Sequence, residues 1–256
     1  MSFSTDTILH QTDKKGFYGI LNDRKFRLQY CKEVLTGISN GISFYFPIVS
    51  FSDIPFSSLN QYLNLYGEYT IGISKNWAKV QSLNPVLYLE SKSFLSELMV
   101  REMGNLTKDF HNQYVQAFVK NYEGPLKTKS KAYSNYRFSD EREWRYAPDP
   151  YSINFDKFLL PEEEFKDKEE DYRKFAFKLG PSFWDQELRY LIVPTITEVH
   201  ELRTRFKENP LLNIFTHEQV LKDIIGGNAN IEIPHPFSLK DKKNNPCNNP
   251  SGNKKR

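Results

Sequence analysis

Cysteine and histidine are scarce in this chain, which has two cysteines and five histidines in 256 residues. Cys31 and Cys247 lie far apart in the sequence, and Cys247 belongs to a polar C-terminal stretch. We therefore expect neither a disulfide framework nor a structural zinc site. The histidines are scattered without a spacing typical of metal ligands, so we expect no metal cofactor.

Long apolar runs are also missing. No stretch approaches the roughly 20 apolar residues that cross a bilayer, and the first residues lack the basic and apolar regions of a secretory signal. Charged residues make up 26% of the chain and hydrophobic residues 39%. This composition is typical of a soluble globular protein, and we expect a cytoplasmic location with no membrane partner.

An excess of basic charge is absent from the body of the chain. The net charge is +3, of which residues 240–256 contribute +5 (six basic residues and one aspartate), so the remainder carries −2. A near-neutral body lacks the basic footprint of a duplex-binding domain. We expect residues 237–256 to form a disordered basic tail, which can make weak, salt-sensitive contacts with nucleic acid.

The short motifs of several common enzyme classes are absent as well. The sequence has no phosphate-binding glycine-rich loop followed by Lys and Ser or Thr, no G-x-G-x-x-G, no H-E-x-x-H and no G-x-S-x-G. These absences argue against the nucleotide-binding, zinc-protease and serine-hydrolase classes that such motifs define.

The hydrophobic periodicity predicts one α+β domain over residues 1–236, with a mixed or antiparallel sheet of six to eight strands flanked by helices. The predicted strands are 7–10, 26–30, 42–51, 69–74, 85–89, 137–146, 188–193 and 213–215. The predicted helices are 14–21 with Asp13 as N-cap, one after Pro55, 75–81, a longer helical zone 93–121 broken by Gly104, 198–208, and 216–224 with a capping box from Thr216 to Gln219. We expect 121–134 to be a loop and 161–176 to be a solvated helical insertion.

A run of charges between aromatic residues, from Arg137 to Arg145, is the most informative segment that the sequence does contain. Side chains alternate between the two faces of a strand, so Glu141, Glu143 and Arg145 would share one face. Two carboxylates at this spacing raise the pKa of one of them unless a cation such as Arg145 compensates. Such a pair can serve as acid, base or electrostatic stabiliser. The alternative is an exposed strand whose charges form cross-strand ion pairs.

Two other predicted strand ends carry polar residues. His10 and Thr12 share a face at the end of the first strand, where side chains often contact ligands. The alternative there is a histidine that hydrogen-bonds a turn. Ser50 and Ser52 share a face at the end of the long apolar strand, and helix capping by Ser52 or Asp53 is the alternative.

Several segments resemble the AbiGi family, whose members are described as the antitoxin of two-component abortive-infection systems of bacteria. The resemblance runs from about residue 7 to residue 225, and it is carried by Leu9–Thr12, Pro47–Pro55, Tyr66–Trp77, Asn84–Tyr88 and Tyr136–Arg145. It implies a role in anti-phage defence and a cognate toxin or antitoxin protein, encoded nearby, as partner.

The layout of these segments is more loosely similar to that of NAD-dependent ADP-ribosyltransferases with an H-x-T motif. This likeness implies a split sheet, NAD as cofactor, and a nucleic-acid or protein acceptor. It implies that His10, Ser50 and Glu143 (or Glu141) converge on one cleft. The implied catalytic residues are Glu143, Glu141 and His10, and the implied NAD-binding residues are His10, Thr12, Ser50, Ser52 and Arg145. No tyrosine pair has a spacing that would clamp nicotinamide, so a non-catalytic antitoxin that binds its partner is the alternative.

Overall fold

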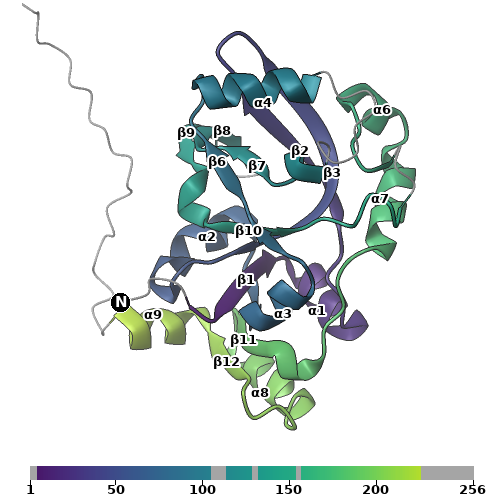
Figure 1. The fold of residues 1–256 in the computed structure, drawn as a ribbon. Coiled ribbons are helices and arrows are strands. Elements are labelled where there is room, and N and C mark those ends of the chain that lie inside the picture. The colour runs from purple at the N-terminus through teal and green to yellow at the C-terminus, as the bar shows by residue number, and fades with distance from the viewer. Residues whose placement is uncertain (1–4, 105–113, 129–131, 154–156, 226–256) are drawn as a thin grey trace, which may run out of the picture.

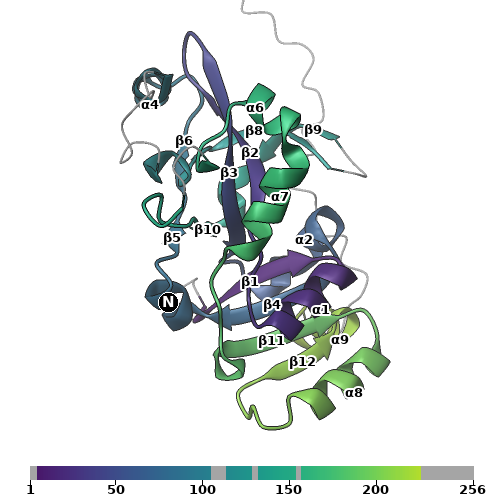
Figure 2. The same cartoon turned by 90° about the vertical axis from the view of Figure 1, so that its right-hand side faces the viewer.

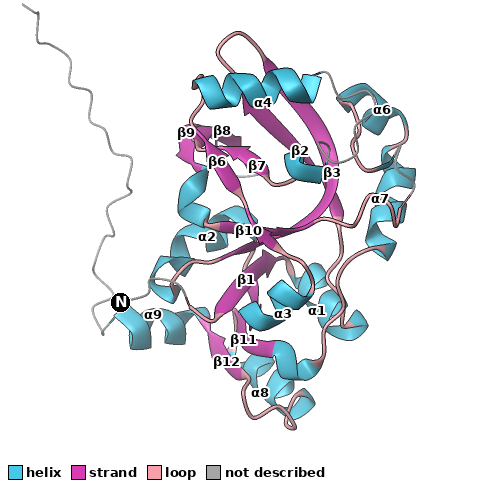
Figure 3. Ribbon diagram, in the orientation of Figure 1, coloured by secondary structure: helices cyan, strands magenta, loops and turns pink. Residues whose placement is uncertain are grey.

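The computed structural model describes residues 5–104, 114–128, 132–153 and 157–225 (Figure 1). The predicted tail, residues 237–256, lies outside the described residues. The main sheet has eight strands, in the order β12 (Asn213–Thr216), β11 (Leu188–Val193), β4 (Tyr69–Ser74), β1 (Thr7–Thr12), β3 (Gly41–Ser52), β10 (Glu143–Tyr146) and β5 (Asn84–Pro85), with β2 (Gln29–Thr36) also paired to β3. A mixed sheet flanked by helices confirms the predicted α+β class (Figure 3).

Strand β3 is 12 residues long, and its two ends pair with different strands. It therefore connects the β2–β3 hairpin to the rest of the main sheet. Its first eight residues pair with β2, and its last four pair with β10. Ser52, at its end, also pairs with Leu9 of β1. In Figures 1 and 2, β3 runs from the upper half down to the centre, where β1 and β10 meet it. Strand β1 then continues the sheet through a six-residue antiparallel pairing with β4.

In the part of the main sheet that contains β1, β4 and β11, different helices cover the two faces. Successive side chains of β1 point to opposite faces, so Ile8 packs into the main core and Leu9 into a second core. The main core receives side chains from α1 (Lys14–Asp23), α3 (Lys75–Val80), α7 (Glu169–Lys178) and α8 (Ile196–Arg205). The second core receives side chains from α2 (Leu59–Tyr66) and α9 (His217–Ile225).

The upper half of the molecule consists of smaller elements around the β2–β3 hairpin (Figure 1). Two short sheets lie there, β6 (Leu87–Leu89) with β7 (Val119–Asn121) in parallel, and β8 (Glu123–Lys127) with β9 (Ala132–Arg137) in antiparallel. Helix α4 (Phe94–Gly104) packs Val100 against Leu35 of the hairpin and Leu89 of β6.

Local sequence signals place several elements correctly. Strands β4 and β11 have the predicted bounds. Asp13 caps α1, because its Oδ1 accepts the Gly16 N–H at 2.7 Å. The capping box is present, since Thr216 and Gln219 exchange side-chain-to-backbone hydrogen bonds of 2.8 and 3.2 Å. Within the described residues, every helix is too short or too polar to cross a membrane.

Three predicted elements are wrong. The predicted helical zone 93–121 is helical over Phe94–Gly104, up to its predicted break, but its last residues form β7 instead of helix. The predicted loop 121–134 contains β8 and the start of β9. The predicted strand 26–30 is displaced, because β2 begins at Gln29 and the Phe26 ring packs against Phe51 and Trp77 in the main core. These short segments obtain their structure from distant partners rather than from their own periodicity.

The predicted charged strand 137–146 is interrupted. Residues Phe138–Glu141 form a single turn of 3-10 helix, and Arg142 has a left-handed backbone with φ of 47°. Only Glu143–Tyr146 belongs to the sheet. The turn is held from outside, because Arg142 donates through Nη2 to Asp53 at 3.2 Å and the Asp53 N–H donates to the Arg142 carbonyl.

The predicted insertion 161–176 is helical but only partly solvated. It forms α6 (Glu162–Asp167) and α7, and one side of this pair buries Phe165, Tyr172 and Ala176 in the main core. The Phe165 ring stacks on Tyr45 with centroids 4.2 Å apart. The insertion is therefore part of the core on its inner side, and its charged residues face solvent on the outer side.

Candidate functional site

Strand β10 presents its charged residues on one face of the sheet. Residues directly opposite each other in an antiparallel pair lie on the same face. Glu143 is opposite Ser52, and Arg145 is opposite Ser50, so these four side chains share a face. Trp144, between the two charged residues, points the other way and packs against the main core.

Glu143 uses both carboxylate oxygens inside the protein. Its Oε1 accepts hydrogen bonds from the Ser50 hydroxyl and from Arg145 Nε at 2.7 Å. Its Oε2 accepts from Arg145 Nη2 at 3.1 Å and from Lys120 Nζ at 3.0 Å. Its backbone N–H donates to the Tyr88 hydroxyl at 2.8 Å. With 4% of its surface exposed, the residue is enclosed by donors.

Arg145 is completely buried, with 0% of its surface exposed. Besides Glu143, its guanidinium reaches Glu33 of β2 through Nη2 at 2.8 Å and the Ala117 carbonyl through Nη1 at 2.8 Å. A planar guanidinium suits this task because its N–H groups diverge in a fixed geometry. Arg145 therefore ties β10 to β2 and to the segment that leads into β7.

Glu141 joins the same group from the 3-10 turn rather than from the strand. Its Oε1 accepts from the hydroxyls of Tyr66 and Tyr136, the second at 2.9 Å, and its Oε2 lies 3.5 Å from Lys120 Nζ. Lys120 thus bridges both glutamates. We refer to the group as the charge cluster; its members are Glu33, Lys120, Glu141, Glu143 and Arg145.

The two glutamates of the charge cluster differ in their electrostatics. Burial alone would raise the pKa of Glu143, but the charges of Arg145 and Lys120 outweigh it and hold this pKa well below the usual range. Burial also raises the pKa of Glu141. The positive charge of Lys120 acts to lower this pKa, but its effect is smaller than that of burial. Burial would lower the pKa of Lys120, but the two glutamates raise it. Glu143 is therefore the ionised member and Glu141 the one that binds a proton more readily, as expected for a carboxylate pair in unequal surroundings.

His10 lies on the opposite face of the sheet from Glu143. Its ring contacts Phe26 and Phe51, each with centroids 5.4 Å away, and its Nδ1 lies 2.9 Å from the Ser50 carbonyl oxygen. Phe51 and Ser50 are consecutive residues of β3, so their side chains point to opposite faces. The predicted convergence of His10, Ser50 and Glu143 on one cleft is therefore wrong for His10, although Ser50 and Glu143 are in contact.

The other predicted site residues are also divided between the faces. Thr12 shares the His10 face of β1, and its hydroxyl lies beside Gly16 at the start of α1, where an added Cβ would come within 2.2 Å of it. Ser52 shares the Glu143 face. Asp53 is not a helix cap; it is buried and forms ion pairs with Lys75 at 2.8 Å and with Arg142.

Sequence reasoning missed Lys120 and Glu33 as members of the charge cluster. Lys120 fell inside a predicted helix, and Glu33 stood in a segment with no assigned strand. On the predicted strand face, two carboxylates accompany one arginine, Arg145, so burial of that face would require a further cation. The choice among the many lysines and arginines of the chain depends on the tertiary structure. Nearby Cys31 is inert, because burial raises the pKa of its thiol to about 12.

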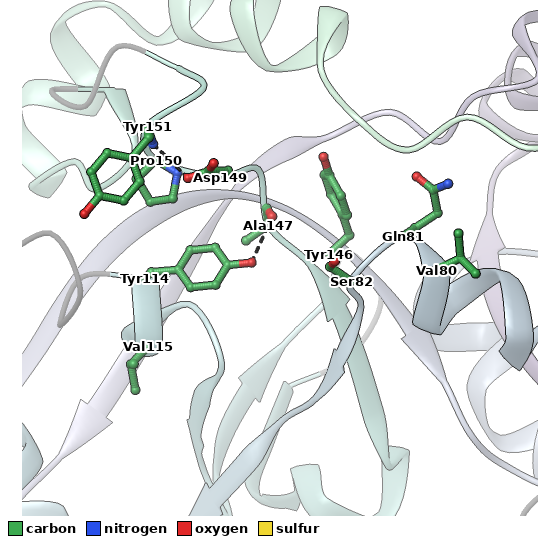
Figure 4. A pocket seen from close by; sticks show the side chains of 10 residues that line it. All are labelled: Val80, Gln81, Ser82, Tyr114, Val115, Tyr146, Ala147, Asp149, Pro150 and Tyr151. Atoms are coloured by element: carbon green, nitrogen blue, oxygen red, sulfur yellow. Dashed lines mark hydrogen bonds between the residues drawn. The ribbon is translucent and has the colours of Figure 1, made fainter.

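A separate cavity of about 620 Å³ lies beyond the far end of β10 (Figure 4). The described residues that line it are Val80, Gln81, Ser82, Tyr114, Val115, Tyr146, Ala147, Asp149, Pro150 and Tyr151. None of the predicted catalytic or NAD-binding residues belongs to this lining. The charge cluster and the cavity are thus two distinct features of β10.

The fold and the site define an α+β protein in which β10, beside the edge strand β5, carries two members of a buried ionic cluster. The sequence profile of the family described as abortive phage resistance protein AbiGi, antitoxin, matches residues 25–194, and the chain belongs to this family. The matched region contains the charge cluster and the cavity, but it leaves out His10 and Thr12.

A relative from Lactococcus lactis subsp. cremoris, named abortive phage resistance protein AbiGi, is 26% identical over 129 residues. The match covers 41% of this chain and 52% of that protein, so it spans about half of the relative's length. No solved structure matches the chain significantly.

His10 makes a testable contribution to stability. Burial lowers its pKa from the usual value, although the hydrogen bond with Ser50 opposes this shift. A group with a lowered pKa binds its proton more weakly in the folded state, so stability is lost as the pH falls below about 6.5. We expect His10→Asn, which keeps a donor near the position of Nδ1, to lose less stability than the wild type between about pH 7 and pH 5. Urea unfolding of both proteins at pH 7 and pH 5 measures the loss of unfolding free energy, and His217 is present in both. Equal losses in the wild type and His10→Asn would contradict the prediction.

Proposed function

We propose that the chain is the antitoxin of a bacterial abortive-infection system and acts by binding and restraining a toxin protein. Membership of the AbiGi family, over a region that includes the charge cluster, is the observation that carries this proposal. The family description names abortive phage resistance and an antitoxin, and an antitoxin requires a toxin as its partner.

The geometry of the charge cluster supports a binding role. A catalytic carboxylate must reach the reacting atoms of a substrate. The oxygens of Glu143 are instead directed at Ser50, Arg145 and Lys120. The contacts with Ser50 and Lys120 connect β10 to β3 and β7, and Arg145, within β10, extends the connection to Glu33 of β2. The cluster is therefore suited to hold β10 rigidly and to fix the surface that β10 supports.

Co-expression tests the proposal. The protein encoded beside this gene is produced from an inducible promoter in a bacterial host, alone and together with this chain. We expect growth arrest in the first case and restored growth in the second. The two purified proteins should elute together in size-exclusion chromatography, because restraint by binding requires a complex. Growth arrest that persists despite a folded, soluble chain would refute the proposed function.

A second candidate function is an NAD-using transferase with an ADP-ribosyltransferase-like split sheet, acting on a nucleic-acid or protein acceptor. The contact between Ser50 and Glu143 favours it, because the likeness to ADP-ribosyltransferases puts these two residues at the middle-strand and catalytic positions. The placement of His10 on the other face and the enclosure of Glu143 and Arg145 weigh against it. The variant Glu143→Gln distinguishes the two candidates.

A further inference from the structure

The cavity beyond β10 is built from three segments of the chain, residues 80–82, 114–115 and 146–151. Val80 comes from the end of α3, Val115 from the segment before β7, Tyr146 from β10 itself, and Tyr151 from the turn that follows it. Figure 4 shows the lining residues arranged around one shared space. A volume of about 620 Å³ is within the range of sites that receive a ligand or a large side chain of a partner.

The rim of this cavity exposes apolar side chains to solvent. Val80 is 72% exposed and Tyr151 is 68% exposed, and Val115 is also exposed. Apolar side chains that gather at a single concave site, rather than lying scattered, mark interaction surfaces. Burial of these side chains against a partner would provide the favourable free energy of binding.

Asp149 is the one charged residue among the described residues of the lining. Its side chain is exposed, and its Oδ1 accepts the Tyr151 N–H at 2.9 Å, which fixes the turn. Burial raises the pKa of Tyr146, and the negative charge of Asp149 adds to this effect. An apolar wall with one carboxylate is complementary to an apolar group beside a cation, and a phosphate would instead require basic residues.

The charge cluster stabilises one wall of the cavity. Tyr146 follows Arg145 directly, and Arg145 fixes this part of β10 through its bonds to Glu143, Glu33 and Ala117. The Tyr114 hydroxyl donates to the carbonyl of Ala147, the next residue, at 3.4 Å. The walls are thus held in place before a partner arrives, which lowers the entropic cost of binding.

We propose that this cavity is the docking site for the toxin, which inserts an aromatic or branched apolar side chain next to a lysine or arginine that pairs with Asp149. The inference rests on the proposed antitoxin function. The inserted side chain is the central anchor of a larger interface, in which a few well-packed residues provide most of the binding free energy.

Binding measurements with surface variants test the docking site. The double variant Val80→Ser, Tyr151→Ser removes two exposed side chains and should leave the fold intact. We expect it to weaken binding of the purified protein encoded beside this gene by about 30-fold or more, measured by calorimetry. Asp149→Asn keeps an oxygen for the Tyr151 N–H but removes the charge, so we expect about 3- to 10-fold weaker binding with a smaller salt dependence.

Matched controls are available because Phe94 and Trp184 are also exposed and lie outside the cavity lining. Phe94→Ser and Trp184→Ser should bind the toxin as the wild type does. Circular dichroism and thermal unfolding establish that each variant is folded.

The outcomes separate the two proposals. If the wild type binds the toxin and the cavity variants bind equally well, the docking site is refuted while the antitoxin function stands. A wild type that neither binds nor neutralises the toxin overturns both. A wild-type dimer that becomes monomeric in the double variant, with toxin binding unchanged, would assign the cavity to a second copy of the chain and refute toxin docking.

Discussion

Replacement of Arg145 by methionine should lower the free energy of unfolding by about 3–5 kcal/mol. Methionine fills a similar volume but leaves Glu143 and Glu33 without their shared cation in a buried site. Breaking a buried ion pair by removing one partner costs this much because the remaining charge has lost both water and its counter-charge. Urea denaturation followed by circular dichroism measures the change.

Arg173→Met is the matched control for this prediction. Arg173 pairs with Glu169 on the surface of α7, where both side chains are about half exposed (50% and 47%). We expect a loss of about 0–1 kcal/mol, because water screens and replaces such a pair. Arg145→Lys should recover only part of the stability, since a lysine cannot reach Glu143, Glu33 and the Ala117 carbonyl together. Similar losses for Arg145→Met and Arg173→Met would refute the structural role of the charge cluster.

Glu143→Gln should cost about 3 kcal/mol of stability and still leave toxin restraint intact in molecules that remain folded. The amide keeps the size of the carboxylate but places an uncharged group between Arg145 and Lys120. The cavity proposed as the docking site does not include Glu143. The protective effect in co-expression, assayed at a temperature where the variant is folded, should therefore match that of the wild type.

The same variant distinguishes an antitoxin from an NAD-using enzyme. For a transferase, loss of a positioned charge commonly costs about 3–4 kcal/mol in the transition state, so turnover would nearly disappear. For an antitoxin, the cellular NAD level should be the same with the wild type, Glu143→Gln and no chain at all. Glu169→Gln, at an exposed position, controls for the substitution itself. Consumption of NAD by the wild type and its loss in folded Glu143→Gln would favour the transferase and refute the antitoxin proposal.

The sequence by itself determined the elements whose signals are local. The Asp13 cap and the Thr216–Gln219 capping box depend on residues three positions apart, and both are present. Strands β4 and β11 are apolar segments with clear ends, and their bounds agree with the prediction. The sequence also predicted that Glu141, Glu143 and Arg145 interact, because they lie within five residues of one another.

The face on which His10 lies was decided by strand register. Leu9 is opposite Ser52, which is opposite Glu143, so Leu9 rather than His10 shares the Glu143 face. A shift of the β1–β3 pairing by one residue would have placed His10 there instead. The amino-acid pattern of β1 alone does not define this register, because pairing depends on two segments that are 40 residues apart.

The chemistry of the carboxylate pair was likewise decided by the tertiary structure. Sequence spacing implied that one carboxyl group would have a raised pKa unless a cation compensated, and both effects are present in different glutamates. Lys120 and Glu33, which complete the cluster, are 23 and 112 residues away from their partners. Burial and counter-charge set the protonation of an acid, and both are properties of the packed fold. The sequence therefore identified three members of the cluster, Glu141, Glu143 and Arg145, and tertiary packing added Lys120 and Glu33 and closed the ionic cluster.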